Sequence, residues 1–378
     1  MRRFLRSRGK VPSAIILVVM LFMNIMVLDG CQKNDKGLKV GANLSLTGSS
    51  PYWSTQIKRG LEVAADESNA DNPADKLTVL YEDNQGQAKN AIAIAQKLAT
   101  MDKVAVMVTA HTPMAQPQQP LVAQYKIPLL ATVVSAVGFG KVNDYSFLDW
   151  PSHEELTPPV AAYAARDLKA KTAITIVVND EYGKDGAEVF KKEFEKAGGS
   201  VLAEETFGNA DKDMRAQLTK LLKTSPDVMY TVAREDALVA VVKQARELGF
   251  KGYVVGVNAF DSPNVWKGLG ELGEGIVFGG VTGHAGSGPD AAAFDAAYEK
   301  KFSEKPDWVS LYGYTIGKYL FPIVIQAKGD PDKIREALSM LKAPSLRGDL
   351  VMSKERKVLS KGIVYIRKGG QNVAVSGK

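Results

Sequence analysis

The sequence predicts an α/β protein built from parallel sheets, and three observations support this fold class. From position 38 onward, apolar residues alternate between the two-residue period of strands and the 3.6-residue period of helices. The strand-like runs are short and rich in valine and isoleucine, as expected when helices cover both faces of a sheet. The helical runs between them are long enough to serve as the crossovers that join parallel strands.

The expected elements follow one another in two blocks. In the first block we expect helices at 56–68, 88–98 and 113–125, and strands at 38–46, 77–81, 104–108 and 127–131. In the second block we expect helices at 185–197, 213–222 and 237–248, and strands at 173–178, 200–206, 227–231, 252–257 and 275–278. The glycine-rich segment 279–288 has too little side chain to pack and is expected to be a connector.

Three helix starts carry a capping signal. Ser152 followed by Glu155 matches a capping box, in which each side chain bonds the other residue's backbone N–H. Thr112 and Ser262 each place a hydroxyl directly before a proline, the arrangement expected of an N-cap followed by proline at the first helical position.

The first 30 residues are expected to be an export signal. Five basic residues among the first ten precede the almost wholly apolar run 11–28, and a removable secretory signal has this layout. A permanent anchor is the alternative, since about 18 apolar residues approach the length of a spanning helix. The motif LDGC, ending at Cys31, resembles the bacterial lipobox, although Asp29 departs from its usual small or hydroxylated residue. We therefore expect lipidation at Cys31 and a tether at 31–37.

The charge of the chain excludes a nucleic-acid-binding protein. The whole sequence has a net charge of +6, but the expected leader contains five of its 48 basic residues and one of its 42 acidic residues. Removal of the leader leaves 43 basic and 41 acidic residues, a balance of +2, whereas nucleic-acid binding needs a strongly basic domain. The remaining residues exceed what one hydrophobic core usually supports, so two domains are expected.

The sequence lacks recognisable motifs for catalysis or metal binding. The one pattern that matches a cofactor-binding motif stands in the wrong structural context. The G-x-G-x-x-G pattern at 268–273 follows an expected short helix, whereas a dinucleotide fingerprint must follow a strand. The three histidines, His111, His153 and His284, lie far apart in the sequence and are expected to be solvated or hydrogen-bonded rather than zinc ligands. We expect no enzymatic activity, no metal and no cofactor.

Four stretches occur in order along the chain: LKVGANLSLTGSSPYWSTQIKRGLEVAADESNA from residue 38, YEDNQGQAKNAIAIAQKL from 81, DEYGKDGAEVFKKEFEKAGG from 180, and GVNAFDSP from 256. Together they resemble the type I periplasmic solute-binding proteins of ABC importers, in the branched-chain amino-acid and amide group. The resemblance implies a monomer that captures a small solute and delivers it to a membrane permease. A ligand sensor with the same fold, signalling through a partner protein, is the alternative.

The resemblance also implies two similar lobes joined by three hinge crossovers, the type I periplasmic binding protein fold. The crossovers are expected near 150–153, 279–284 and 343–347. One lobe would then comprise 38–151 and 284–342, and the other 152–283 and 343–378.

Ligands of open parallel sheets bind beyond the carboxyl ends of the strands, and the expected site lies there. Thr112, as a helix cap, and Ser135, after the next strand, would offer donors to a carboxylate. The resemblance implies that Trp53 is an aromatic wall and that Tyr182 closes the site. The expected ligand-binding residues are Tyr52, Trp53, His111, Thr112, Val134, Ser135, Tyr182, Arg234 or the adjacent Ala233, Asn258 and Asp261.

Two departures from the family bear on the ligand. Amino-acid binders of the family place a carboxylate near Asn258, and an amide cannot neutralise a buried ammonium, although Asp261 is close in sequence. Arg234 stands where a tyrosine is often found and favours an anionic planar partner, unless it is solvated or paired with Glu235 or Asp236. The sequence thus favours an organic acid, including an aromatic one, with a free amino acid as the alternative.

Overall fold

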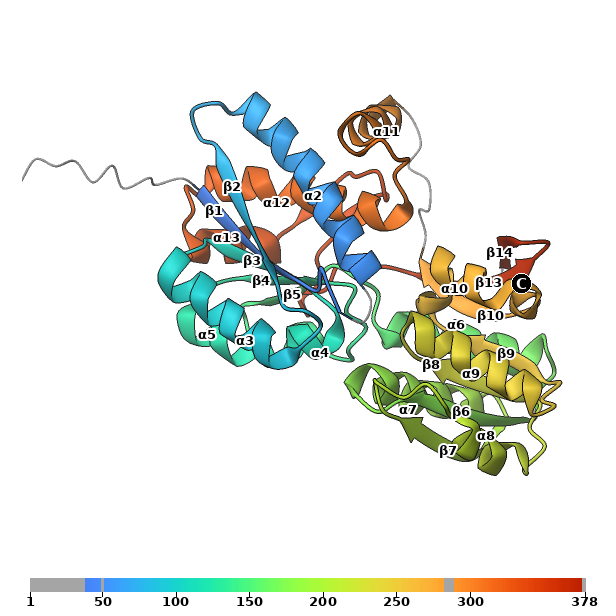
Figure 1. Ribbon diagram of the computed structural model, residues 1–378. Helices are drawn as coiled ribbons and strands as arrows, with labels where there is room; N and C mark the ends of the chain where they lie inside the picture. The colour runs from blue at the N-terminus through green and yellow to red at the C-terminus, as the bar shows by residue number, and fades with distance from the viewer. Residues whose placement is uncertain (1–37, 49–50, 282–288, 376–378) are drawn as a thin grey trace, which may run out of the picture. The chain divides into compact units, whose positions relative to one another are not determined.

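The computed structural model describes residues 38–48, 51–281 and 289–375 (Figure 1). Contacts divide the chain into residues 1–37 and residues 38–378, and the description below concerns the second unit. The expected signal peptide, the tether and Cys31 lie outside the described residues, as does His284.

The first sheet has five parallel strands in the order β2-β1-β3-β4-β5. Their bounds are β1 Leu38–Leu44, β2 Leu77–Asp83, β3 Val106–Ala110, β4 Leu129–Thr132 and β5 Ser146–Leu148. The crossover helices are α2 Pro51–Asp71, α3 Ala88–Lys97 and α5 Gln119–Tyr125. Every residue of β3, β4 and β5 is buried, which explains their apolar sequences.

Three later helices also belong to the described structure: α11 Pro289–Phe302, α12 Trp308–Gln326 and α13 Pro331–Ser339. The long helix α12 packs against α2 (Figure 1), and two glycines allow the backbones to approach closely. A Cβ atom on Gly60 would lie 2.0 Å from the carbonyl oxygen of Ser310, and one on Gly313 would lie 2.2 Å from that of Ile57. Only glycine fits at these two positions, because real Cβ contacts are never so short.

The second sheet has seven strands in the order β14-β13-β10-β9-β8-β6-β7. Five of them are parallel: β6 Thr172–Val178, β7 Ser200–Phe207, β8 Val228–Val232, β9 Tyr253–Gly256 and β10 Val277–Val281. The last two, β13 Gly362–Lys368 and β14 Gln371–Val375, add an antiparallel hairpin beside β10. The helices are α6 His153–Arg166, α7 Glu181–Lys196, α8 Arg215–Leu222, α9 Glu235–Glu247 and α10 Pro263–Leu269. A short pair, β11 Lys342–Ala343 and β12 Leu350–Val351, stands apart.

The predicted fold class, α/β with parallel sheets, is confirmed. The segment 113–125 is helical as predicted, but it is not one uninterrupted α-helix. This segment is divided into α4 (Thr112–Ala115), a 3₁₀ turn (Gln116–Gln118) and α5. Pro117 and Pro120 explain the breaks, because a proline inside a helix lacks the N–H and clashes with the carbonyl four residues earlier.

Two of the three predicted helix caps are confirmed. Ser152 and Glu155 form a capping box, and the Ser262 hydroxyl accepts a hydrogen bond from the backbone of Asn264. The prediction for Thr112 is wrong, because α4 begins at Thr112 itself and His111 occupies the cap position without a side-chain cap bond.

The glycine-rich segment is not a connector throughout. Its first three residues, 279–281, are buried members of β10, and residues 282–288 lie outside the described part of the chain. Glycine is needed at 279 for packing, because a Cβ atom there would lie 2.3 Å from the carbonyl oxygen of Leu156 in α6. Some further differences are at element ends: α2 and α7 begin earlier than predicted, and β1 ends at Leu44. The strand β5, the helices α11, α12 and α13 and the hairpin of β13 and β14 were not among the predicted elements.

Candidate functional site

A hollow lies beyond the carboxyl ends of strands from both sheets. From the first sheet it is lined by side chains that follow β1, β3, β4 and β5, namely Trp53, His111, Thr112, Val133, Ser135 and Trp150. From the second sheet it is lined by side chains that follow β6, β8 and β9, chiefly Tyr182, Arg234, Glu235 and Asn258. This hollow, the central cavity, is where a parallel-sheet protein is expected to hold a ligand.

The backbone is strained where β3 and β4 end at the central cavity. His111 and Val133 directly follow Ala110 and Thr132, which are partners in the strand register. Both have positive φ, +69° and +53°. A positive φ is rare for a residue other than glycine and exceptional for a β-branched one such as valine. Such strain concentrates at functional sites, where the surrounding structure holds it in place.

One hydrogen bond ties these two loops together. The buried hydroxyl of Thr112 accepts it from the backbone N–H of Ser135, at 3.2 Å. The carbonyl of Ser135 in turn accepts a bond from the N–H of His153, the first residue of α6, at 3.0 Å. The strand ends of the first sheet are thereby connected to the helix that begins the second block.

An aromatic cluster forms one wall of the central cavity. Trp53 is 5% exposed and lies in the first turn of α2, which begins at Pro51 rather than at the predicted residue 56. Its ring meets those of Trp308 and Trp150 edge-on, with centroids 5.5 and 6.2 Å apart. This favourable geometry for aromatic pairs fixes the orientation of the Trp53 ring.

Three polar atoms of the lining residues are buried and have no hydrogen-bond partner among the described residues: Nε2 of His111, Nε1 of Trp150 and Oδ1 of Asn258. Burial, together with the charge of Arg234, lowers the pKa of His111 to about 3, so the ring is neutral at pH 7. An unsatisfied buried polar atom costs about 1–3 kcal/mol. Hydrogen-bonding groups of a ligand would remove this cost.

Arg234 lines the central cavity and is held by neighbouring polar residues. Its Nη2 forms an ion pair with Asp180 at 2.7 Å, and its Nη1 donates to Asn209. The alternative partners considered from the sequence, Glu235 and Asp236, are wrong. Asp180 caps α7 and Arg234 precedes α9, so the pair also fixes these two helix starts to each other.

Glu235 is a lining residue that the sequence analysis missed. Its side chain belongs to the first turn of α9, and the residue is 8% exposed. The Ser262 hydroxyl donates to Oε1, and the Asn264 amide lies 3.5 Å from Oε2. Glu235 therefore places a carboxylate in this part of the site, where the sequence analysis had considered only the amide of Asn258 and the carboxylate of Asp261. Arg234 was predicted as a site residue because it follows the end of a strand. Glu235 is the next residue in the sequence, so the same criterion could have found it.

A family model for the periplasmic binding proteins matches residues 37–368. The chain belongs to this family. Among curated proteins it resembles the Leu/Ile/Val-binding protein BraC3 of Rhizobium johnstonii, with 22% identity over 73% of this chain and 76% of the relative.

Solved structures show the same type I fold. The substrate-binding protein LivJ of Streptococcus pneumoniae, in complex with isoleucine, aligns with a TM-score of 0.78 at 22% identity over 89% of this chain and 98% of that one. A solute-binding protein of an ABC transporter from Rhodopseudomonas palustris, in complex with 3,4-dihydroxybenzoic acid, has a TM-score of 0.78 at 22% identity, covering 90% and 97%.

In this periplasmic binding protein the central cavity brings together seven of the ten expected residues: Trp53, His111, Thr112, Ser135, Tyr182, Arg234 and Asn258. Three do not line it. The Tyr52 hydroxyl donates to Asp307, Val134 is buried in the core beside the lining residue Val133, and Asp261 accepts a hydrogen bond from Asn372 at 2.6 Å.

Tyr182 reaches the central cavity from the start of α7 and rests on a buried histidine. Its ring centroid lies 5.3 Å from that of His153, whose Nε2 donates to the Tyr182 carbonyl at 2.9 Å. Burial raises the pKa of the Tyr182 phenol, so the hydroxyl stays protonated and can donate a hydrogen bond to a ligand.

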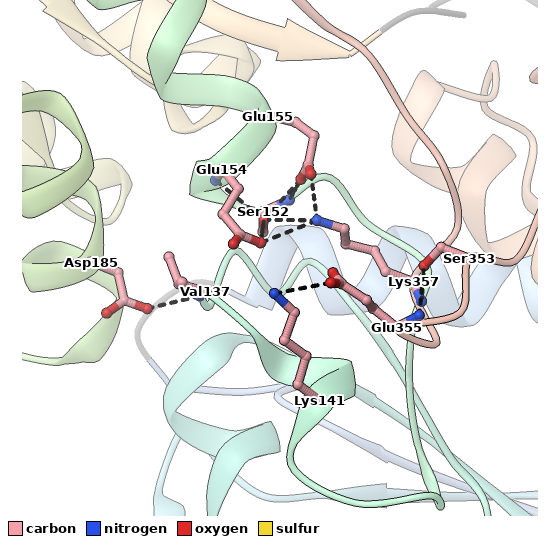
Figure 2. Close-up of polar contacts among 9 residues, drawn as sticks. All are labelled: Val137, Lys141, Ser152, Glu154, Glu155, Asp185, Ser353, Glu355 and Lys357. Atoms are coloured by element: carbon pink, nitrogen blue, oxygen red, sulfur yellow. Dashed lines mark hydrogen bonds and ion pairs between the residues drawn. The ribbon is translucent and has the colours of Figure 1, made fainter. Parts of the chain in front are cut away.

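Polar contacts surround the segment of the periplasmic binding protein where the chain passes from β5 to α6 (Figure 2). Lys357 forms ion pairs with Glu154, at 3.2 Å, and with Glu155. The N–H of Val137 donates to Asp185 in α7 at 2.9 Å. The side chain of Lys357, from the C-terminal segment, thus holds the start of α6, and one bond joins the loop after β4 to the second block.

No helix among the described residues is both long and apolar enough to span a bilayer. Within the same residues, no three or more side chains of His, Cys, Asp or Glu gather in a way that could hold a metal ion.

Proposed function

We propose that this protein is an extracytoplasmic lipoprotein that captures a small carboxylate-bearing solute and delivers it to an ABC permease of the inner membrane. The observation that carries the proposal is the central cavity, where strand ends of two parallel sheets present Nε2 of His111 and Oδ1 of Asn258 without partners among the described residues. Membership of the periplasmic binding protein family supports the same role.

Several groups favour a carboxylate on the solute. The hydroxyls of Thr112 and Ser135 belong to the lining, and the guanidinium of Arg234 enters from the other sheet. Charge-assisted hydrogen bonds to a carboxylate are about twice as strong as neutral ones. The ligands named for the two solved relatives, isoleucine and 3,4-dihydroxybenzoic acid, both carry this group.

We propose that 38–151 with 284–342, and 152–283 with 343–378, act as two lobes that close around the solute by hinge motion. We also propose that the protein is a monomer, held at the membrane by lipid on Cys31 after removal of the leader. The proposed role is binding without turnover, so the solute leaves chemically unchanged.

A ligand screen tests the proposal. A solute that binds only the folded protein raises its melting temperature, so amino acids, amides and organic acids are added singly to the purified protein. Hits are then measured by calorimetry, with a Kd near the micromolar range, about 8 kcal/mol, as the expected result. Failure of every compound to bind, or conversion of a bound compound to product, would contradict the proposed function. Loss of uptake of the hit in cells lacking the protein would separate transport from the sensing alternative.

A further inference from the structure

Exposed lysines stand at the edge of the first sheet where its strands begin. The parallel strands β1, β2, β3 and β4 all start at this edge (Figure 1). A Cβ atom on Gly329 would lie 3.2 Å from the side chain of Leu38, the first residue of β1, so the chain after α12 reaches the same edge. Four exposed lysines, which we call the lysine edge, precede β2, β3 and β4 or follow α12: Lys76, Lys103, Lys126 and Lys328.

The fold does not neutralise the lysine edge. None of its four lysines forms an ion pair with another residue that the structure describes. Two acidic residues nearby are already paired with other cations. Asp102 pairs with Lys97, and Asp144 pairs with Arg356, each at 3.0 Å. The four lysine charges are therefore available to a partner outside the protein.

The remaining charges at this edge leave it positive. Asp71 and Asp75 are exposed and pair with no cation among the described residues. Residues 330–335, at the start of α13, contain two acidic and two basic side chains and add no net charge. Four lysines against two carboxylates give a balance of +2.

Three of the four lysines occupy backbone positions that glycine would fill more easily. Lys103, Lys126 and Lys328 each follow the end of a helix, with φ of +53°, +55° and +52°. Glycine or asparagine usually takes this left-handed position, because a Cβ atom is unfavourable there. The helix dipole favours a cation in the last turn but does not require it at the left-handed residue. The turns alone therefore do not explain the lysines.

The proposed lipid tether enters the fold at the same edge. Leu38 is the register partner of Leu77, the residue after Lys76, and six residues, 32–37, separate it from Cys31. Because an extended chain spans at most about 3.6 Å per residue, the start of β1 stays within about 25 Å of the lipid. These six residues include two lysines and one aspartate and so add one positive charge.

A tethered basic surface is attracted to an anionic bilayer. Each lysine near such a surface raises the equilibrium constant for contact about fivefold. A short tether also keeps the local concentration of the surface high, so that weak attraction is enough. Met101 is 75% exposed and lies two residues before Lys103, where its apolar side chain can enter the headgroup region.

We infer that the lysine edge rests on the anionic phospholipid headgroups of the membrane that holds the anchor. The carboxyl ends of the first sheet, and the central cavity beyond them, then face away from the bilayer while the protein waits for solute. The inference rests on the lipid anchor of the proposed function and is independent of the identity of the solute.

A fluorescent label at the lysine edge tests the inference in the lipidated protein. Cys31 is the only cysteine and is consumed by the lipid, so an introduced cysteine is the single free thiol. Met101→Cys carries a label whose emission shifts to the blue when it leaves water, and Ser200→Cys carries it at the exposed start of β7 in the second sheet. In vesicles of phosphatidylcholine and phosphatidylglycerol, the label at position 101 should shift and the label at 200 should not. Vesicles of phosphatidylcholine alone should shift neither.

Neutral variants identify the charges that are responsible. Changing all four residues of the lysine edge to glutamine should lower the ratio of membrane-bound to free label at position 101 about tenfold or more. Salt raised from about 0.1 M to about 1 M, which shortens the Debye length from about 10 Å to about 3 Å, should have the same effect.

The matched control changes four exposed lysines that surround the starts of strands in the second sheet, which has no tether: Lys169, Lys171, Lys223 and Lys251. One of them, Lys169, has the same left-handed backbone, with φ of +56°. The control variant should behave as the wild type. Melting temperatures establish that both fourfold variants fold.

The outcomes separate the inference from the proposed function. A label at position 101 that stays in water on anionic vesicles, or a shift that survives loss of the four lysines, overturns the inference and leaves the anchor and solute binding intact. Equal shifts at positions 101 and 200 also overturn it, because they would show adhesion without orientation. If mass spectrometry finds no lipid on Cys31, the proposed anchor fails and the inference with it.

Discussion

Arg347 holds Asp149 through two hydrogen bonds, from Nη1 to Oδ1 at 3.1 Å and from Nη2 to Oδ2 at 2.7 Å. The two side chains are 5% and 1% exposed. The hydroxyl of Tyr319 donates a further bond to Oδ2 at 2.9 Å, and the guanidinium lies 3.8 Å from the ring centroid of Tyr312. The pair thus connects the residue after β5 to the segment expected to be the third crossover.

Removal of the cation from this pair should destabilise the protein strongly. Arg347→Met leaves Asp149 as a buried charge, and breaking a buried pair in this way costs about 3–5 kcal/mol. The free energy of unfolding is measured by urea denaturation. Lys318→Met is the matched control, because the Lys318–Glu67 pair is exposed and such pairs contribute about 0–1 kcal/mol. If the free energy of unfolding falls equally in the two variants, the buried pair contributes no more to stability than the exposed pair, and the prediction is wrong.

A methyl group between α2 and α12 should separate the two helices. Gly313→Ala would place Cβ 2.2 Å from the carbonyl oxygen of Ile57, and overpacking of this kind costs about 1–3 kcal/mol. Gly208→Ala is the control, since its nearest neighbours would lie 3.3 Å away on the side chain of Asp211. The melting temperature should fall clearly in the first variant only; an unchanged value for Gly313→Ala would contradict the tight packing described.

Buried histidines should make stability depend on pH below neutrality. Burial, partly offset by the bond to Tyr182, lowers the pKa of His153 from 6.5 to about 4. Because the folded pKa lies below the unfolded one, the unfolded chain takes up the proton first. The contribution is therefore complete above pH 6.5 and is lost as the pH falls toward 4.

The expected loss from His153 alone is about 1.5 kcal/mol between pH 6.5 and 5. His153→Gln should remove that part of the pH dependence, and urea denaturation of both proteins at the two pH values measures it. His111, with a pKa lowered to about 3, remains in the variant and contributes in the same direction. A variant whose stability falls as steeply as that of the wild type would refute the assignment.

Lipidation predicts the behaviour of Cys31→Ala. If Cys31 carries the anchor, this variant should retain the leader or be released, with a changed mass and a changed distribution between membrane and soluble fractions. Mass spectrometry and fractionation check both. Identical mass and membrane partitioning in wild type and variant would rule out Cys31 as the anchor.

The sequence by itself determined the layered α/β architecture and the edge of the sheets where the site lies. The physical reason is that this information is local in the sequence. The spacing of apolar residues distinguishes strands from helices, and parallel strands bring their carboxyl ends to the same edge of a sheet. This is why Thr112, Ser135, Arg234 and Asn258, which follow four different strands, were all expected in the lining.

Only the tertiary structure decided which side chain at each strand end faces the central cavity. Val133 takes the place expected for Val134 because its backbone adopts φ of +53°, a conformation that a valine does not signal in sequence. Tyr52 and Trp53 are adjacent, yet the packing of α2 on α12 turns one toward Asp307 and the other into the wall.

Glu235 is the clearest case of a residue whose contacts depend on the tertiary structure. An acidic residue in the first turn of a helix is favoured by the helix dipole alone, so its sequence position indicates no ligand. Its surroundings depend on Ser262, the cap of α10, and on Asn264 within α10, which hold the carboxylate, and on Asp180, which pairs with Arg234. These contacts join residues that are distant in sequence, and local periodicity contains no information about them.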